Sequence, residues 1–299
     1  MCDASGEQVF RGRYLSCCDD VRMDVAVLEV GGSHVTAALV GRGSWDVTEV
    51  GRAKLESRVA AEVVVEQLAE TARKLPLANG LVIALPGPFD FDTGVAWYRG
   101  QGKFDQLYGF DLGAALRTEL GIDRLLFLND AEAFAVGEWT AGEVRGVERC
   151  VGVTIGTGIG TAFLADGRVV REGDTVPPGG ELYQTTYAGK PLEDSISARA
   201  ILREFAARTG TEAPGVKEIA DQARAGDAVA KDVLVSAFTH LADALAPWIE
   251  RFGVTRTVLG GSIAGAFDLV RSAFDFEVAA TQDTERSGLI GAAAHYVRS

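Results

Sequence analysis

The sequence predicts an α/β protein made of two similar halves. Its apolar runs alternate between short, strand-like segments and longer, helix-like segments, which favours sheets flanked by helices. A strand, glycine turn and strand also occur twice in succession, as DVAVLEV-GGS-HVTAALV from Asp24 and as CVGVTI-GTG-IGTAFLADGRVV from Cys150. Gly31 and Gly156 hold equivalent places in these units, 125 residues apart. Two hairpins can resemble each other by chance, so the repeat alone leaves duplication and coincidence equally open.

The elements between the two hairpins follow from their apolar spacing. Residues 55–75 have apolar side chains every three to five positions, which predicts an amphipathic helix with Leu55, Val59, Val63, Val64 and Leu68 on its buried face. The run GLVIAL at 80–85 predicts a strand that Pro86 and Pro88 stop. A short helix at 112–120 then leads to a strand at 125–128.

The second half ends in a long helix, a strand and a final helix. Apolar side chains recur at helical spacing at Val229, Val233, Phe238, Leu241, Leu245 and Trp248. We expect Pro247 to kink or end that helix, because proline lacks the N–H that the helix needs. TRTVLGG at 255–261 predicts a strand, and SGLIGAAAHYV at 287–297 predicts the last helix.

Composition restricts the function. The 299 residues are 47% hydrophobic, and this length favours two domains over one core. A net charge of −13 argues against binding nucleic acid or an anionic membrane through a basic surface, so we expect a small-molecule substrate. No signal peptide or apolar run of about 18 residues is present, which predicts a soluble, cytoplasmic protein. Residues 1–22 show no clear period, and we expect them to be a disordered extension.

Three glycine turns, each directly after an apolar strand, are candidates for binding phosphate. They are Gly31-Gly32-Ser33, Gly156-Thr157-Gly158-Ile159-Gly160 and Gly260-Gly261-Ser262 at the start of an expected helix. Backbone N–H groups in such turns bind anions because no side chain blocks the approach. Each turn alone is also explained by steric need. They match neither a dinucleotide fingerprint, because Thr161 replaces its last glycine, nor a Walker lysine motif.

The strand LLFL ends in Asn129-Asp130, a carboxylate at the mouth of a buried strand. This pattern has two explanations. Asn129, with Glu132 three residues later, is typical of a helix cap with its return partner. Alternatively, Asp130 is a general base that accepts the proton of a hydroxyl group.

The order of these segments resembles the ROK family of sugar kinases, within the hexokinase, actin and Hsp70 superfamily. The resemblance covers nearly the whole chain from Met23 and rests on six segments in order: EVGGS, ALPGP, LND, TIGTGIG, VLGGSI and GLIGAA. It implies two ribonuclease-H-like lobes with the active site between them. Residues 23–128 with 287–299 would form the smaller lobe, and 129–286 the larger. It also implies cytoplasmic ATP-dependent phosphorylation of a sugar, with Mg²⁺, in a homodimer.

The resemblance assigns roles residue by residue. Asp130 resembles the catalytic base, and Asn129 and Gly87 lie beside the sugar. The turns described above, with their residues Gly31, Gly32, Ser33, Gly156, Thr157, Gly158, Gly260 and Gly261, would hold the nucleotide. Glu29 stands where the family has an aspartate that holds hydrated Mg²⁺, and Ser33 stands where threonine is usual.

The sugar side departs from the family pattern. In GGELYQTTYAGKPLEDSISARA, Glu181 and Glu193 match the family's two glutamates, and a helix is expected after the second. Gln184 replaces the usual histidine, Tyr183 replaces a glycine, and the zinc-binding cysteines are absent, so we expect no zinc. Because Gln184 offers different hydrogen-bonding groups, we expect glucose to be a poorer substrate than an amino sugar or a cyclitol. Ordinary exposed acids are the alternative for both glutamates.

Three functions remain open from the sequence. An ATP-dependent sugar kinase is the first. A repressor of the same family is the second, and it would need a DNA-binding segment before the fold and a basic face. The third is a sugar-binding protein without activity, which the retention of Asn129, Asp130, Glu181 and Glu193 disfavours. The identity of the acceptor, and polyphosphate instead of ATP as donor, stay open.

Overall fold

The first lobe is built on a five-stranded mixed sheet. The computed structural model describes residues 24–299, so the expectation for residues 1–22 lies outside the described residues. The strand order is β3-β2-β1-β4-β7, in which β1, β2 and β3 are antiparallel and β4 and β7 run parallel to β1. The bounds are β1 Val25–Val30, β2 His34–Val40, β3 Val47–Lys54, β4 Leu81–Leu85 and β7 Leu125–Asn129.

The second lobe repeats this arrangement. Its strand order is β10-β9-β8-β13-β14, again with an antiparallel edge, and with β13 and β14 parallel to β8. Both halves thus begin with a hairpin that a parallel strand extends, as the repeated unit predicts. The bounds are β8 Arg149–Ile155, β9 Ile159–Ala165, β10 Arg168–Val170, β13 Arg256–Gly260 and β14 Val278–Ala280.

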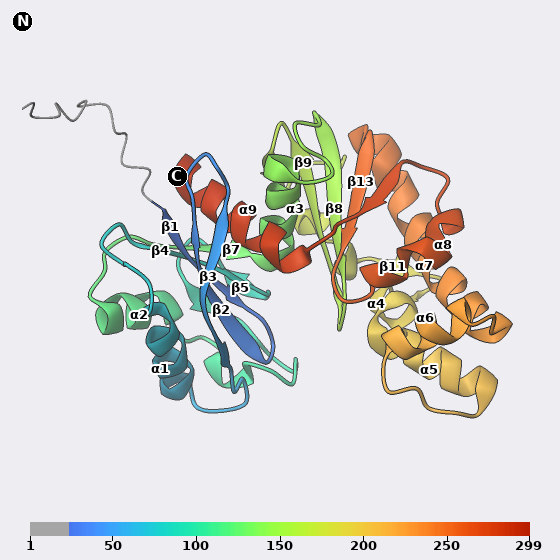
Figure 1. Cartoon of the computed structure of the whole chain (residues 1–299), viewed down its shortest axis with the longest axis horizontal. Coiled ribbons are helices and arrows are strands. Elements are labelled where there is room, and N and C mark those ends of the chain that lie inside the picture. Colours follow the sequence, from blue (N-terminus) through green and yellow to red (C-terminus); the bar gives the residue numbers. More distant parts are fainter. Residues whose placement is uncertain (1–23) are drawn as a thin grey trace, which may run out of the picture.

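Two helices cover the outer face of the first sheet (Figure 1), α1 (Ala61–Ala72) and α2 (Leu112–Leu120). Helix α1 begins six residues later than the apolar spacing predicts, and Leu55 is buried ahead of it. Val63 is 41% exposed, so the prediction that it faces the core is wrong. Its neighbours Val64 and Leu68 fill that face instead. The short strands β5 (Phe89–Asp90) and β6 (Val95–Ala96) form a separate hairpin.

The outer end of the second lobe is helical (Figure 1). Its longest helix continues past Pro247, so of the two outcomes expected there the end is wrong, and the kink stays a prediction. The buried stripe from Val233 to Leu245 and Phe252 continues on both sides of the proline and offsets its missing hydrogen bond. Val229 is 40% exposed, contrary to its expected place on that stripe. The helices are α4 Glu193–Ile196, α5 Ala198–Thr209, α6 Val216–Arg224, α7 Ala228–Phe252 and α8 Phe267–Val270, beside the hairpin of β11 Thr186–Tyr187 and β12 Lys190–Pro191.

Two central helices, α3 (Asp130–Ala141) and α9 (Thr284–Arg298), join the lobes (Figure 1). They approach so closely that a methyl group on Gly137 would lie 1.8 Å from the Ser287 carbonyl oxygen. A methyl group on Gly291 of α9 would meet the Ala133 carbonyl in the same way. The division into residues 23–128 with 287–299 and residues 129–286 stays a proposal. Within residues 24–299, no helix has the length and apolar character that a membrane crossing requires.

Candidate active site

Asn129 ends β7 and caps α3, so the cap interpretation of Asn129 is confirmed. Its Oδ1 accepts the N–H groups of Ala131 at 2.9 Å and Glu132 at 3.2 Å. The cap uses only the oxygen of the amide. Its Nδ2 lies toward Gly87, where a methyl group would be 3.8 Å away. Asn129 can therefore cap the helix and still donate a hydrogen bond to a substrate hydroxyl.

The predicted return partner of this cap is wrong. The carboxylate of Glu132 instead accepts hydrogen bonds from Nε and Nη2 of Arg171, each at 2.6 Å. Only 8% of the Glu132 side chain is exposed, and this paired carboxylate raises the pKa of Arg171. Arg171 follows β10, so the ion pair joins the start of α3 to the segment that leads to Glu181.

Asp130 is the first residue of α3, and its side chain is open to solvent. Its Oδ1 accepts the N–H of Ala131 at 2.8 Å, which orients the carboxyl group. The protein that surrounds this position displaces water and raises the pKa of Asp130, while the helix amides and the charge of Lys103 lower it. An accessible carboxylate with a raised pKa fits a general base.

Two glycine turns present free amide groups. Gly31 donates its N–H to the His34 carbonyl at 2.9 Å and so closes the first turn. Gly156 does the same with Gly158, also at 2.9 Å, in the second turn. Within residues 24–299, no protein group accepts the remaining N–H groups of the two turns, which belong to Gly32, Ser33, Thr157 and Gly158. These free donors fit phosphate oxygens.

The third turn does not fit phosphate in this way. Gly261 donates its N–H to the Thr284 hydroxyl at 2.8 Å, so that donor is already used. A methyl group on Gly260 would lie 2.6 Å from the Phe134 ring, and one on Gly261 would lie 2.3 Å from the Ile155 carbonyl oxygen. Close packing thus explains both glycines. The expected helix after them is short and irregular: α8 is flanked by the 3₁₀ turns Ala264–Ala266 and Arg271–Ala273.

Glu181 is held by a residue that the sequence did not single out for the sugar side. The buried Thr161 hydroxyl donates to the Gly180 carbonyl at 2.8 Å and accepts the Leu182 N–H at 2.9 Å. Both neighbours of Glu181 are thereby fixed to β9. In the sequence Thr161 is notable only because it breaks a glycine pattern, and no local signal indicates its partners Gly180 and Leu182, which lie 19 and 21 residues later.

Gln184 orients Glu181. Its Nε2 donates to Oε2 of Glu181 at 2.7 Å, and Tyr183 also bonds that carboxylate. Loss of water raises the pKa of Glu181 despite these hydrogen bonds, and the nearby charge of Asp130 adds to the rise. Burial together with Glu181 raises the pKa of Tyr183 to about 12. Glu181 and Asp130 thus lie near enough to influence each other.

Glu193 begins α4, where the helix was expected to follow it. It contacts the second glycine turn, since its Oε1 accepts the Ile159 N–H at 2.9 Å. Its other carboxylate oxygen has no protein donor within residues 24–299. The structure therefore brings Asp130, Glu181, Gln184 and Glu193 to one region, in which Glu193 also supports the turn.

Glu29 on β1 fits a role in holding a hydrated cation. Its Oε2 is buried without a hydrogen-bond partner, and Oε1 would lie 3.2 Å from a methyl group on Gly288. Burial, with Glu285 and Asp130 nearby, raises the pKa of Glu29 to about 8. Within residues 24–299, no three His, Cys, Asp or Glu side chains form a metal-binding group. Mg²⁺ needs only one or two protein carboxylates beside water and phosphate, so Glu29 suffices.

Lys103 is a second residue of this region that the sequence did not indicate. It lies in a glycine-rich loop, and its charge acts on Asp130. A methyl group on Gly32 would be 3.3 Å from Cδ of Lys103 and 3.8 Å from its Nζ. The GQGK stretch has no apolar period, so only the combination of glycines and a lysine after a strand pair could have drawn attention to it.

Comparison with known proteins identifies relatives of this chain. The model of the ROK family matches residues 25–296. A glucokinase of Thermotoga maritima is 26% identical over 307 residues, which cover 89% of this chain and 95% of that protein. The DNA-binding transcriptional repressor Mlc of Escherichia coli is 23% identical over 66% of this chain and 52% of its own length.

The fold also matches solved structures. A glucokinase from Streptomyces griseus, solved with glucose and AMPPNP, superposes with a TM-score of 0.73 at 19% identity. The match covers 92% of this chain and 100% of that one. The two-lobed arrangement of mixed sheets is thus common to both chains.

Proposed function

Because this chain belongs to the ROK family, we propose that it is an ATP-dependent kinase that phosphorylates a hydroxyl group of a hexose or hexose-like substrate. The similarity to a glucokinase over 95% of that protein's length supports a sugar kinase in general. The specific base, the acceptor and the donor are inferred from the residues of the site.

The observation that carries this proposal is the setting of Asp130. Its carboxyl group is accessible, oriented by the Ala131 N–H, and adjacent in sequence to the free amide nitrogen of Asn129. An alcohol becomes a good nucleophile only when a positioned base accepts its proton. We infer that Asp130 accepts the proton of the reacting hydroxyl, while Asn129 donates a hydrogen bond to a neighbouring hydroxyl and Gly87 leaves room for the ring.

The remaining acidic groups fit a polyol. Glu181 is presented by Thr161 and Gln184, and Glu193 keeps one carboxylate oxygen for a ligand. Each carboxylate oxygen can accept hydroxyl hydrogen bonds, so the two glutamates suit a ring that carries several hydroxyl groups. An amino sugar or a cyclitol meets the same need, and the exposed carbonyl of Gln184 adds an acceptor that an amino group can use.

The donor side follows from the two glycine turns. The free N–H groups of Gly32, Ser33, Thr157 and Gly158 would hold phosphate oxygens, and Glu29 would hold Mg²⁺ through water. ATP would supply the phosphoryl group, and Mg²⁺ would neutralise its charge. Polyphosphate offers the same phosphate oxygens, so it is tested as an alternative donor.

The match to a DNA-binding transcriptional repressor favours a second candidate, a regulatory protein of this family that binds a sugar and does not phosphorylate it. One experiment separates the two. ADP formation is measured with ATP and Mg²⁺ over a panel of hexoses, amino sugars and cyclitols, and sugar binding is measured by calorimetry on the same panel. Stoichiometric ADP and sugar phosphate support the kinase. Binding of a sugar with no phosphorylation by ATP or polyphosphate would support the second candidate.

A further inference from the structure

A tight loop, residues 100–104, stands beside the first glycine turn. Three of its residues have left-handed backbone angles: Gly100 with φ 68°, Gly102 with φ 70° and Phe104 with φ 59°. Glycine adopts this conformation freely, whereas phenylalanine rarely does. The Phe104 ring is only 3% exposed and packs 5.2 Å from the Tyr98 ring, which keeps the residue in place. The loop is therefore fixed on both sides of Lys103.

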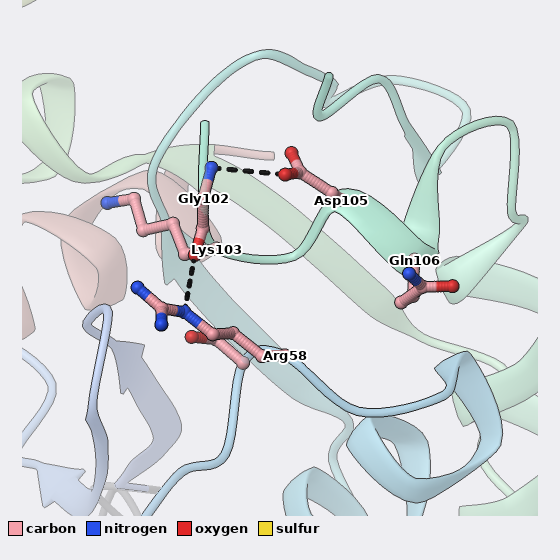
Figure 2. A pocket seen from close by; sticks show the side chains of 6 residues that line it. Arg58, Gly102, Lys103, Asp105 and Gln106 are labelled. Carbon is pink, nitrogen blue, oxygen red and sulfur yellow. Dashed lines mark hydrogen bonds between the residues drawn. The ribbon is translucent and has the colours of Figure 1, made fainter. Parts of the chain in front are cut away.

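Hydrogen bonds fasten this loop. Asp105 accepts the N–H groups of Gln101 at 3.0 Å and Gly102 at 3.1 Å, and Arg58 donates from Nε to the Gly102 carbonyl at 2.8 Å. Figure 2 shows the contacts of Gly102 with Asp105 and Arg58, and the Lys103 side chain extends away from Asp105 and Gln106. A cavity of about 220 Å³ borders the loop and is lined by Ser57, Arg58, Gly102, Lys103, Asp105 and Gln106.

The loop is also tied to the first glycine turn through Ser57. Phe104 donates its N–H to the Ser57 carbonyl at 2.6 Å, and the Ser57 hydroxyl donates to the Gly32 carbonyl at 3.0 Å. The position of the Lys103 backbone relative to the free N–H groups of Gly32 and Ser33 is thus set through the carbonyl and the hydroxyl of Ser57. Such indirect support fixes a charged group more firmly than a flexible surface loop can.

The ammonium group of Lys103 has no hydrogen-bonding partner and no ion-pair partner in the part of the chain that the structure describes. It lies between two features of the proposed reaction, the amides of the first turn and the carboxylate of Asp130. On a chain with a net charge of −13, an unpaired cation that is held at this position indicates an anionic ligand.

We propose that Lys103 binds the phosphoryl group that is transferred to the substrate and neutralises its charge during transfer. This inference rests on the proposed kinase function and adds a catalytic residue to it. The substrate hydroxyl oxygen forms a bond to the γ-phosphorus, and Asp130 takes the hydroxyl proton. The bond from that phosphorus to the β,γ-bridging oxygen breaks, and its electron pair leaves on ADP. Lys103 contacts the γ-phosphoryl oxygens throughout.

The test compares Lys103→Gln, Lys103→Arg and the control Lys231→Gln, which removes one exposed positive charge on α7. Calorimetry measures the affinity for AMPPNP and for ADP. Only AMPPNP carries the γ-phosphoryl group, so Lys103→Gln should weaken its binding about 10-fold or more while ADP binding changes less than about 2-fold. Lys103→Arg should restore much of the preference for AMPPNP over ADP. Where a sugar is phosphorylated, kcat of Lys103→Gln should fall about 10²- to 10³-fold.

A pH profile separates this role from a structural one. The charged or titratable groups around Asp130 are Lys103, Glu132, Glu29, Glu181 and Tyr98. Loss of the Lys103 charge removes a stabilising cation from the Asp130 carboxylate, so the acidic limb of kcat/KM should move to higher pH in Lys103→Gln. It should not move in Lys231→Gln.

The possible outcomes separate the role of Lys103 from the kinase function. An active wild-type enzyme with an unchanged AMPPNP-to-ADP affinity ratio in Lys103→Gln would overturn the role of Lys103 and leave the kinase intact. A wild-type chain that binds neither nucleotide and phosphorylates no sugar would overturn the proposed function, and the role of Lys103 with it. Unfolding of Lys103→Gln in a thermal melt, with Lys103→Arg folded but unable to discriminate AMPPNP, would also count against the proposal.

Discussion

Glu193 accepts the backbone N–H of Ile159 at 2.9 Å, which joins the proposed sugar side directly to the second glycine turn. The contact is so close that a methyl group on Gly158 would lie 2.3 Å from the same carboxylate oxygen. A residue of the proposed sugar side therefore also shapes the turn whose N–H groups are proposed to bind phosphate. Substitutions of Glu193 should therefore affect the binding of both the nucleotide and the acceptor.

We expect Glu193→Ala to raise KM for both the nucleotide and the acceptor, by about 5- to 150-fold for each, because the Ile159 N–H loses its partner and the turn loses its support. Glu193→Gln keeps an oxygen that can accept this N–H and should raise mainly the acceptor KM. Steady-state kinetics with each substrate varied in turn measures both. Glu212→Gln, on an exposed loop, is the control. An Ala variant with an unchanged nucleotide KM would refute the link.

Thr161→Val should impair acceptor binding and leave nucleotide binding intact. The substitution removes a buried hydroxyl that both Gly180 and Leu182 use, so the turn that carries Glu181 loses two hydrogen bonds. An unsatisfied buried group costs about 1–3 kcal/mol, which corresponds to an increase of about 5- to 150-fold in acceptor KM. Thr161→Ser keeps the hydroxyl and serves as the matched control. Equal acceptor KM values for the Val and Ser variants would speak against this role.

The sequence predicted the features that depend on local patterns. Asn129 and Asp130 were found because an apolar strand ends directly before them, and the structure confirms the cap that Asn129 forms. The repeated hairpins suggested two similar halves, since the hydrophobic pattern and the glycine turns lie within each unit, and the two sheets have matching strand orders. Contacts between distant residues gave no such signal. The hydroxyl of Thr161 and the carboxylate of Glu193 acquire their partners only through the fold.

The failures have the same cause. A Gly260-Gly261 pair after a strand is typical of a phosphate-binding turn. Here close packing accounts for both glycines, because Phe134 and the Ile155 backbone from distant segments leave no room for a side chain. Pro247 breaks isolated helices, yet α7 continues because its buried face is continuous on both sides. Glu132 has the right spacing for a capping box, and an ion pair with Arg171 offers it a stronger partner.

The raised pKa of Glu29 predicts that the free energy of unfolding depends on pH. Below its ordinary pKa of 4.5, Glu29 is protonated in both the folded and the unfolded chain. As the pH rises toward about 8, the unfolded chain loses a proton that the folded chain keeps, so burial of Glu29 costs progressively more stability. The cost stops growing above the folded pKa. Glu29→Gln should therefore stabilise the free protein on the order of 2–4 kcal/mol at pH 8 and much less at pH 5.

Thermal melts at pH 5 and pH 8 measure this difference, with the exposed Glu49→Gln as the control. Without ligand at pH 8, Glu29→Gln should have a higher Tm than the wild type. Addition of Mg²⁺ and nucleotide should make the wild type the more stable of the two, since the cation stabilises the wild-type carboxylate and not the amide. Equal gains in Tm at both pH values would contradict the raised pKa. A variant that Mg²⁺-nucleotide stabilises as much as the wild type would exclude Glu29 from the cation site.

Gln184 predicts the choice of acceptor. Its Nε2 is used by Glu181, which leaves the carbonyl oxygen to meet the substrate. An acceptor with an amino or further donor group at that position should be preferred over glucose by about 5- to 150-fold in kcat/KM. Steady-state comparison across hexoses, amino sugars and cyclitols decides this. Gln184→His should change the ranking. Glucose at or near the top, or no change in ranking with histidine, would defeat this prediction.

The role of Asp130 is tested most directly by Asp130→Asn, with the exposed Asp123→Asn as control. Transfer of the phosphoryl group is followed as sugar phosphate and ADP formed together, and acceptor binding is measured by calorimetry. We predict that Asp130→Asn binds the acceptor and melts like the wild type, whereas its kcat falls at least ~10²-fold because no base accepts the hydroxyl proton. An Asp130→Asn enzyme that forms sugar phosphate at the wild-type rate would remove Asp130 from the mechanism and contradict the account.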